Sequence, residues 1–255
     1  MIDTHTHLYD EQFEQDRIEM IKRAIESGVE RMYLPNCDAT TIEPMFEVER
    51  KFPNHCFAMM GLHPCYVKEN VDEELNIVRK WLDERKFCAV GEIGLDYYWD
   101  KSFVEPQKRA FRTQIEWALE FDIPIVIHTR EATKDTIDIV KEYCAKGIKG
   151  VFHCFSGSYE TAMQIIDMGF YLGIGGVLTY KNAGLQEVVQ RLDLKHLVLE
   201  TDAPYLTPAP FRGKRNESHY VHYVAQKLSE LKDVSIDEID RITTTNANEL
   251  FKFSK

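Results

Sequence analysis

Two histidines near the start of the chain, His5 and His7, have a spacing that suits adjacent ligands of one metal ion. In a β-strand, side chains two positions apart point to the same face, so the two imidazoles would lie side by side. Imidazole is a common metal ligand in proteins. A hydrogen-bonded pair of core or surface histidines would have the same spacing, so this pair alone does not identify a metal site.

Further candidate ligands fall within or at the ends of other short apolar runs. Together with the first pair, the set comprises His5, His7, Glu92, His128, His153 and Asp202. An imidazole or carboxylate inside an apolar strand carries a desolvation cost unless it is paired or bound to a metal. One such residue has an ordinary explanation, but six at equivalent depths in their runs favour a common metal site.

The elements that would bring these residues together alternate between strand and helix. Most of the strand-like runs are continuously apolar, as expected of parallel strands covered on both faces, and segments of helical period lie between them. We predict a single domain, residues 1–255, with an α/β fold of the (β/α)8 (TIM) barrel type. Eight runs rich in β-formers recur at intervals of about 20–36 residues and begin near Ile2, Arg31, Cys56, Cys88, Pro124, Gly150, Tyr171 and Leu197.

Boundary signals accompany the helical segments. Pro106 is expected at the first position of a helix, and Gly28, Gly147 and Gly169 follow helical runs where a C-terminal glycine belongs. No G-x-G-x-x-G or Walker loop opens any of these helices, so we expect no nucleotide cofactor. Active sites of barrels of this type lie at the C-terminal ends of the strands, which is where the candidate ligands fall.

Four histidines and two carboxylates are too many for a single tetrahedral zinc ion, and they suit two divalent ions. We expect Glu92 to bridge the ions, because a carboxylate offers two oxygens. His5 and His7 would hold one ion, and the other would be held by His128 and His153. Nitrogen-rich ligation favours Zn²⁺, Mn²⁺ or Fe²⁺ as tight occupants, while Mg²⁺ could support turnover.

The two acidic residues near the end of the eighth run receive different roles. Asp202 is expected to bind a metal, orient the attacking water and accept its proton. Glu200 precedes it by two positions and could share its face. We rank Glu200 as a residue behind the metal ligands or as a structural residue.

Several other residues are candidates for contact with a phosphate. His63 could reach the phosphate or pass a proton to the leaving oxygen, or it could simply cap the turn that Pro64 makes. Arg130 could hold a phosphate oxygen, although a structural ion pair is an alternative. A proline-rich loop after the eighth run carries the positively charged residues Arg212, Lys214 and Arg215. These residues could contact the phosphate backbone of a substrate, or they could simply form a charged loop exposed to solvent.

The remaining aromatic and histidine residues carry weaker signals. Side chains that could stack on bases or pack over the barrel mouth are Tyr97, Tyr98 and Trp99. Histidines without ligand spacing to the set, which we expect to be surface or structural residues, are His55, His196, His219 and His222.

The composition excludes several classes of protein. A net charge of −11 argues against a protein that coats nucleic acid through a broad basic surface. No apolar run approaches the roughly 18 residues needed to span a bilayer, and no secretory signal is evident, so no membrane association is expected. The six cysteines form no C-x-x-C pair, and we expect reduced thiols in a cytoplasmic protein.

Several motifs resemble those of the TatD-type metal-dependent deoxyribonucleases, and the resemblance extends over essentially the whole chain. The segment 210–217 is similar to that family's basic loop after the eighth strand, although Phe211 stands where a histidine is common. The motifs are Asp3-Thr4-His5-Thr6-His7, Gly61-Leu62-His63-Pro64, Gly91-Glu92-Ile93-Gly94-Leu95-Asp96, His128-Thr129-Arg130, His153-Cys154-Phe155-Ser156-Gly157 and Glu200-Thr201-Asp202-Ala203-Pro204.

This resemblance implies an amidohydrolase-like barrel in which a glutamate bridges the metals, with the same six ligands. It also implies a DNA substrate, and we expect exonucleolytic cleavage of single strands. The residues by themselves indicate only a binuclear metal hydrolase, with a phosphate ester as the favoured substrate. The alternatives are hydrolysis of a carboxylic ester, amide or aminoacyl-tRNA ester, and a nucleic-acid-binding barrel without turnover. The sequence leaves the oligomeric state open.

Overall fold

The computed structural model describes residues 1–252 of the 255-residue chain. Within these residues the strands are β1 (Ile2–Asp3), β2 (Arg31–Leu34), β3 (Cys56–Ala58), β4 (Val90–Asp96), β5 (Ile125–Arg130), β6 (Gly150–Phe152), β7 (Tyr171–Ile174) and β8 (Leu197–Leu199). The α-helices are α1 (Arg17–Glu26), α2 (Ile42–Lys51), α3 (Val71–Glu84), α4 (Val104–Phe121), α5 (Thr133–Cys144), α6 (Tyr159–Asp167), α7 (Leu185–Arg191), α8 (Val221–Lys232) and α9 (Ile236–Leu250).

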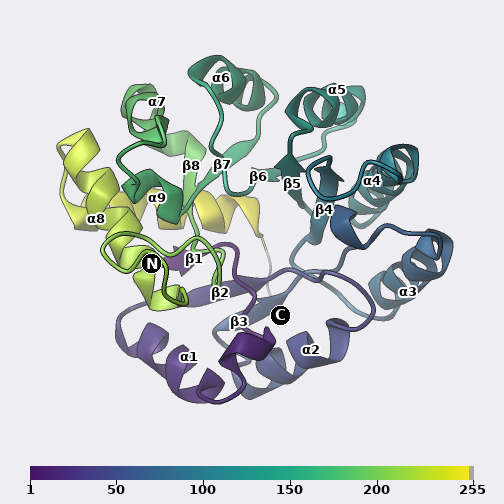
Figure 1. Cartoon of the computed structure of the whole chain (residues 1–255), viewed down its shortest axis with the longest axis horizontal. Coiled ribbons are helices and arrows are strands. Elements are labelled where there is room, and N and C mark those ends of the chain that lie inside the picture. Colours follow the sequence, from purple (N-terminus) through teal and green to yellow (C-terminus); the bar gives the residue numbers. More distant parts are fainter. Residues whose placement is uncertain (253–255) are drawn as a thin grey trace.

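All paired strands are parallel, and they form two sheets in the orders β1-β2-β3 and β4-β5-β6-β7-β8. Backbone hydrogen bonds join the sheets at both edges. At one edge, the N–H of Gly91 donates to the carbonyl of Met60 (3.1 Å). At the other, the N–H of Thr4 donates to the carbonyl of Leu199 (3.0 Å). Figure 1 shows the strands around a central axis, with helices outside them.

The eight runs singled out in the sequence are all strands, and each strand begins within two residues of the expected position. The helix expected to begin at Pro106 begins instead at Val104, so the proline occupies its third position. The first-turn N–H groups of a helix lack intrahelical partners, which is why proline is tolerated there as well. Positive φ angles of 96°, 87° and 82° confirm Gly28, Gly147 and Gly169 as residues that follow helix ends.

Side chains alternate along the strands between two apolar clusters. In β5, Ile125 and Ile127 pack with the surrounding helices, whereas Val126 points to the opposite face. Val126 packs there with Val151 and Val198 from neighbouring strands. Because side chains two positions apart share a face, the residues that follow these valines by two positions continue along the same inner surface.

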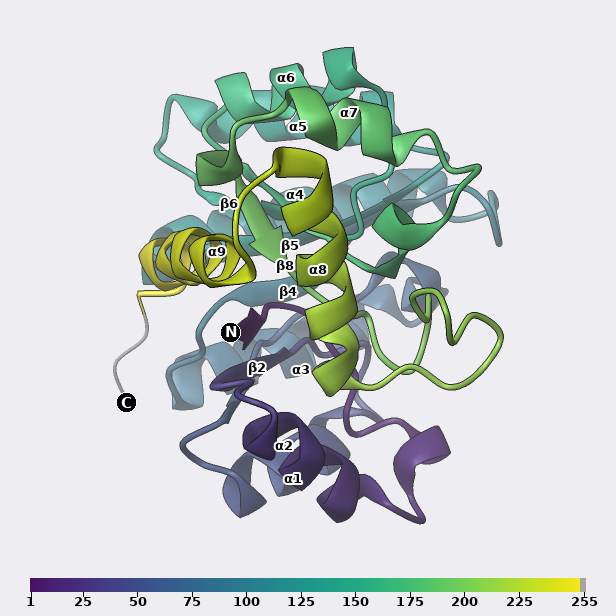
Figure 2. The same ribbon diagram turned by 90° about the vertical axis from the view of Figure 1, so that its left-hand side faces the viewer.

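Helix α9 covers the N-terminal ends of the strands. Its Asn246 side chain donates to the carbonyls of Leu194 (2.8 Å) and Leu197 (2.7 Å), and Phe251 stacks on Tyr33 of β2 at 4.3 Å. Figure 2 shows α9 on one side of the strands and the long loop after β8 on the other. The C-terminal ends of the strands therefore remain open to a site. Within residues 1–252, no helix has both the length and the apolar character to cross a bilayer.

Candidate metal centre

Two of the six predicted ligands lie within strands, and four lie just beyond strand ends. Glu92 belongs to β4 and His128 to β5. His153 directly follows β6, two positions after inward-facing Val151, just as His128 follows Val126. Asp202 lies three residues beyond the end of β8. The ligands thus come from different strands but reach the same end of the fold.

The expectation that His5 and His7 lie in a strand was wrong, because β1 ends at Asp3. After β1, successive backbone N–H groups donate hydrogen bonds to the chain on opposite sides. The N–H of Thr6 donates to the carbonyl of Tyr33 on one side (3.1 Å), and that of His7 donates to the carbonyl of Ala203 on the other (2.7 Å). This divided bonding ends the ladder but still directs both imidazoles into the pocket.

Glu92 lies at the centre of the ligand set, and its two oxygens face different histidines. Oε2 lies 3.1 Å from Nε2 of His5 and 3.7 Å from Nε2 of His7. Oε1 lies 2.8 Å from Nε2 of His153 and 2.9 Å from Nδ1 of His128. The carboxylate thus divides the histidines into the two pairs that the sequence predicted.

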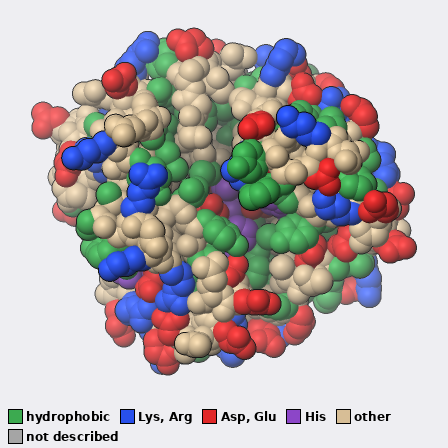
Figure 3. All heavy atoms as spheres, viewed as in Figure 1, with side chains coloured by type: hydrophobic (Ala, Val, Ile, Leu, Met, Phe, Trp, Pro, Cys, Tyr) green, Lys and Arg blue, Asp and Glu red, His purple; other side chains and the backbone are tan. Residues whose placement is uncertain are grey.

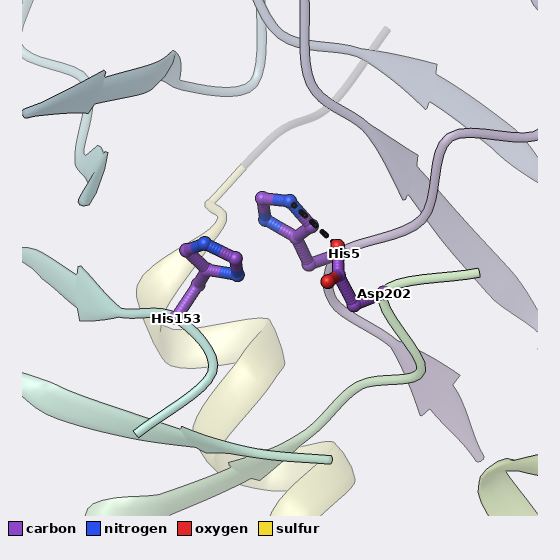
Figure 4. Close-up of side chains that lie close together, drawn as sticks. All are labelled: His5, His153 and Asp202. Carbon is purple, nitrogen blue, oxygen red and sulfur yellow. Dashed lines mark ion pairs between the residues drawn. The ribbon is translucent and has the colours of Figure 1, made fainter. Parts of the chain in front are cut away.

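Asp202 belongs to the side of the pocket that holds His5 and His7. Its Oδ1 lies 3.7 Å from Nε2 of His5 and 3.5 Å from Nε2 of His7. Figure 4 shows Asp202 beside His5, with the ring of His153 on the other side of that histidine. The rings of His5 and His153 are stacked with centroids 3.9 Å apart. His5 is therefore enclosed by groups from β6 and β8.

Asp202 has a left-handed backbone conformation, with φ of 57°. A non-glycine residue adopts this conformation only where its surroundings impose it. Its N–H donates to the carbonyl of His5 (2.9 Å), which ties it to the chain after β1. Buried Asp3 fixes the preceding residue by accepting from the N–H (2.9 Å) and the hydroxyl (2.6 Å) of Thr201. Burial raises the pKa of Asp3 to about 7 against these hydrogen bonds, which lower it.

Three of the ligand histidines are oriented by groups behind them. Nε2 of His128 lies 2.9 Å from Oδ2 of Asp96, so its Nδ1 is directed at Glu92. Nδ1 of His153 faces Oε1 of buried Glu200 at 3.6 Å, an electrostatic contact that is too long for a hydrogen bond. Carboxylates behind a histidine fix its ring orientation and increase its basicity toward a metal. Glu200 therefore faces the ring nitrogen of His153 that is turned away from Glu92.

Tyr9 orients the third histidine, His7. The Tyr9 hydroxyl donates to the carbonyl of Pro35 (2.5 Å) and lies 2.9 Å from Nδ1 of His7. Because its one proton is directed at Pro35, the hydroxyl can only accept from the imidazole. The proton of neutral His7 is thereby assigned to Nδ1, which leaves the Nε2 lone pair directed into the pocket.

The donor set fits metal ions. Within residues 1–252, neither ring nitrogen of fully buried His5 has a hydrogen-bond partner, because the 3.1 Å contact of Nε2 with Glu92 lacks hydrogen-bond geometry. Buried polar groups without partners are rare in folded proteins, and a ligand imidazole in such a state calls for a cation. Groups of three whose ligand atoms lie within 4.8 Å of one another are His5 with His7 and Glu92, His5 with His153 and Asp202, and His63 with Glu92 and His128.

Electrostatics keep the central glutamate ionised. Burial acts to raise the pKa of Glu92, but the surrounding histidines, His153 foremost, hold that pKa well below its usual range. Burial lowers the pKa of His5, and the charge of His153 adds to this effect. Metal binding requires deprotonated carboxylates and neutral imidazoles. Glu92 and His5 therefore have the charge states that a metal ligand needs.

His63 caps the turn after β3 and also faces the pocket. Its Nδ1 accepts the N–H of Cys65 (3.1 Å) and so caps the turn after β3. Its Nε2 lies 3.3 Å from Oε1 of Glu92. Because the accepting Nδ1 carries no proton, neutral His63 carries its proton on Nε2, where it faces the pocket.

The predicted phosphate contacts divide into two kinds. Within residues 1–252, no ion pair involves Arg130, Arg212 or Lys214. Arg130 and Arg212 instead lie over aromatic rings, 3.7 Å from the centroid of Tyr98 and 4.4 Å from that of Tyr180. Arg215 differs, because its guanidinium pairs with Asp16 (2.6 Å) and Glu217 (3.0 Å).

The mouth of the pocket is hollowed and lined by apolar side chains. Figure 3 shows histidine at the base of a central hollow, with hydrophobic side chains around it. Exposed aromatic residues near the ligands include Tyr66, whose ring lies 6.0 Å from His63, and Tyr205, whose ring lies 6.0 Å from His7. The four histidines expected to be surface or structural residues, His55, His196, His219 and His222, lie outside the candidate metal groups found in residues 1–252.

Sequence reasoning missed the residues that hold the ligands in place. Asp96 ends the motif of residues 91–96, and its position four residues after Glu92 in the same run was an available signal. Tyr9 follows His7 by two positions, which suggests a shared face but not the contact with Pro35. Asp3 gave no sign that it would bind Thr201, which lies 198 residues away.

Comparison with known proteins identifies the family. The sequence matches the family described as TatD related DNase over residues 2–252. The chain belongs to this family. It is 44% identical over its full length to the metal-dependent hydrolase YabD of Bacillus subtilis, all of which is covered. The protein is thus a metal-dependent hydrolase of the TatD family.

Two further relatives connect the family to nucleases and to a known structure. The 3'-5' ssDNA/RNA exonuclease TatD of Erwinia tasmaniensis is 32% identical, with 98% of this chain and 99% of that protein covered. The crystal structure of the TatD homologue YJJV of Escherichia coli superposes with a TM-score of 0.93 at 30% identity, covering 100% of this chain and 98% of that one. TatD members thus share the parallel α/β architecture described above.

Proposed function

We propose that this TatD-family protein cleaves DNA phosphodiester bonds, that it trims single strands from their ends, and that it uses two divalent metal ions. The observation that carries the proposal is the position of Glu92, whose two oxygens face two separate pairs of histidines. A carboxylate shared in this way suits a pair of ions that hold both the attacking and the leaving oxygen of a phosphoryl group.

The ligands would divide between the two ions as follows. His5, His7 and Oε2 of Glu92 would hold one ion together with Asp202, and His128, His153 and Oε1 of Glu92 would hold the other. Bound ions supply Lewis-acid polarisation of the phosphoryl oxygens and an acidified water. Nitrogen-rich ligation favours Zn²⁺, Mn²⁺ or Fe²⁺ in the protein, with Mg²⁺ as a candidate for turnover.

The chain's own side chains perform the proton transfers and hold the substrate. Asp202 accepts the proton of the attacking water at a carboxylate oxygen. His63 donates the Nε2 proton to the leaving oxygen. Arg130 binds a non-bridging phosphate oxygen and offsets charge in the transition state.

A nucleic-acid substrate is supported by a relative and by the loop after β8. The Erwinia tasmaniensis relative is described as an exonuclease of single-stranded DNA and RNA. In the loop, Arg212 and Lys214 offer cations that are not used in ion pairs within residues 1–252, and we propose them as contacts to the strand backbone. Arg215 is the weakest of the predicted contacts, because Asp16 and Glu217 already engage its guanidinium.

We also propose that the two sheets form one closed (β/α)8 barrel and that the chain is one domain. Hydrogen bonds at both seams support closure, from Thr4 to Leu199 and from Gly91 to Met60. A closed barrel places all eight C-terminal strand ends around one site. The predicted domain runs to residue 255, and its last three residues lie outside the described residues.

Cleavage assays with a matched pair of variants test the proposal. The wild-type protein with added Mn²⁺ or Mg²⁺ is expected to degrade a single-stranded oligonucleotide, and EDTA is expected to stop it. Asp202→Asn should lower turnover by about 10²–10⁴-fold. Asp233→Asn is the control, since Asp233 has a similar φ of 53° at the end of α8. Hydrolysis of a simple carboxylic ester without cleavage of any oligonucleotide would contradict the proposal.

A further inference from the structure

Two adjacent aromatic side chains protrude from the turn after β4. Trp99 is 69% exposed and Tyr98 is 48% exposed, which makes Trp99 the most exposed large apolar side chain in residues 1–252. The two rings meet edge to face, with centroids 4.9 Å apart. Burying a tryptophan side chain normally stabilises a fold, so its exposure at this position suggests a binding role.

This turn is fastened to the metal centre through one carboxylate. Oδ1 of Asp96 accepts the N–H groups of Tyr98 (2.9 Å) and Trp99 (3.2 Å), while Oδ2 lies 2.9 Å from Nε2 of His128. The carboxylate that orients a metal ligand therefore also holds the aromatic turn. The backbone of Trp99 is thus tied to the same carboxylate that contacts His128.

Arg130 adds a positive charge to the aromatic pair. Its guanidinium carbon lies 3.7 Å from the ring centroid of Tyr98 and 5.3 Å from that of Trp99. Arg130 ends β5, two residues after His128, and is paired in register with Asp96. Within residues 1–252 its side chain makes no ion pair or hydrogen bond. The ring of Tyr98 therefore holds the guanidinium of Arg130 in place, while the N–H donors of Arg130 stay available for an anion.

We propose that Trp99 and Arg130 form a subsite for one nucleotide of a single strand next to the scissile phosphate. Trp99 stacks on an unpaired base, and Arg130 binds the scissile phosphate, to which that nucleotide is attached. This inference rests on the proposed phosphodiesterase function. In a duplex, base faces are covered by neighbouring bases, so a stacking residue selects for single strands without reading sequence.

The subsite makes two distinct contacts with its ligand, and the two can be separated experimentally. Stacking on Trp99 requires the base, whereas binding to Arg130 requires only the phosphate. A single-stranded oligonucleotide and an abasic strand of the same length carry the same phosphates. The base-bearing strand should therefore bind more tightly, and the difference should depend on Trp99 alone.

Fluorescence anisotropy with metal-loaded protein tests this separation. Binding is measured in an Asp202→Asn background, where turnover is suppressed. Trp99→Leu should weaken binding of the base-bearing strand by roughly 5- to 150-fold, the range of one stacked base, and leave binding of the abasic strand unchanged. Trp99→Phe keeps an aromatic face and should retain most of the difference. Arg130→Gln should weaken binding of both strands by a similar factor.

The results that would overturn the subsite differ from those that would overturn the nuclease. Base stacking would be refuted if the Asp202→Asn protein bound the two strands equally. It would also be refuted if Trp99→Leu weakened binding of both strands equally, even if the wild type cleaves DNA. Conversely, base-dependent binding without cleavage by the wild type would uphold the subsite as a binding site and refute the proposed phosphodiesterase.

Discussion

The metal centre and the loop after β8 lie at the same end of the strands, but their charged residues are arranged in opposite ways. In the centre, His5 is buried without a hydrogen-bond partner in residues 1–252, and its ring stacks on another imidazole. In the loop, Arg215 is engaged by Asp16 and Glu217. His5 thus has nitrogens that only a ligand could satisfy, whereas the guanidinium of Arg215 is already neutralised by the protein.

The same distinction separates residues within the loop itself. Arg212 and Lys214 lie over the aromatic rings of Tyr180 and Phe211, at 4.4 Å and 5.9 Å from the ring centroids, which leaves their charges available to a ligand. Arg215 also lies over a ring, that of Phe13 at 4.6 Å, but acidic groups neutralise it. The positions of these three residues in the sequence do not show which of them is free to bind a ligand. Their contacts in the structure do.

The largest effect is expected at the bridge of the metal centre. Glu92→Gln removes the negative charge that the two metal ions would share. It should lower cleavage by about 10³-fold or more, because bound metal ions contribute several kcal/mol of transition-state stabilisation. Glu49→Gln is the matched control. Glu49 is also buried, but it pairs with Arg85 (2.8 Å), so this variant should lose stability and keep its metal content. Equal metal content in both variants would contradict the bridging role.

A smaller effect is expected at Tyr9. Tyr9→Phe removes the hydroxyl that fixes the proton of His7 on Nδ1 and should weaken metal affinity about 10- to 100-fold. Competition with a chelating dye measures the affinity, and the electronic spectrum of the Co²⁺-substituted protein reports the ligand geometry. Tyr205→Phe is the control, because the Tyr205 ring also lies beside His7 but its hydroxyl donates to Asp10 (2.9 Å). Equal behaviour of the two variants would refute the positioning role.

Arg215 should affect stability more than catalysis. Arg215→Gln breaks the contacts that join the loop to Asp16 and should lower the free energy of unfolding by about 1 kcal/mol, since the pairs are partly exposed. We expect kcat/KM for an oligonucleotide to change little, because Asp16 and Glu217 already engage the guanidinium. Arg212→Gln should do the reverse, with unchanged stability and weaker strand binding. Chemical denaturation and steady-state kinetics on both variants distinguish these outcomes.

The smallest effect is a pH dependence at Glu217. Burial acts to raise the pKa of Glu217, but His219, Arg23 and Arg215 lower it to about 2 from 4.5. A carboxyl whose pKa is lowered by folding stabilises the fold above its unfolded pKa, and the contribution disappears as pH falls through the folded pKa. The difference in unfolding free energy between wild type and Glu217→Gln should thus be fully present above pH 4.5 and shrink as pH falls toward about 2. A difference that is constant across this range would contradict the assignment.

The sequence predicted the strands, and predicted that the candidate ligands would come together in one pocket, for a physical reason. His128 and His153 interrupt apolar runs, where an unpaired imidazole is costly, and period-two alternation places them on the inner face. The residues behind the ligands were not predictable in this way. The contact from Asp96 to His128 joins neighbouring strands in a particular register, which the sequence does not specify. The pairing of Arg215 with Asp16 spans 199 positions and depends on how the loop after β8 folds back.

The most direct test of the account is anomalous X-ray diffraction from crystals of the wild-type protein loaded with Zn²⁺ or Mn²⁺. We predict two anomalous peaks about 3.5–4 Å apart, one on each oxygen of Glu92, the first beside His5 and His7 and the second beside His128 and His153. A single peak, or peaks that Glu92 does not join, would contradict the two-metal centre on which the proposed nuclease depends.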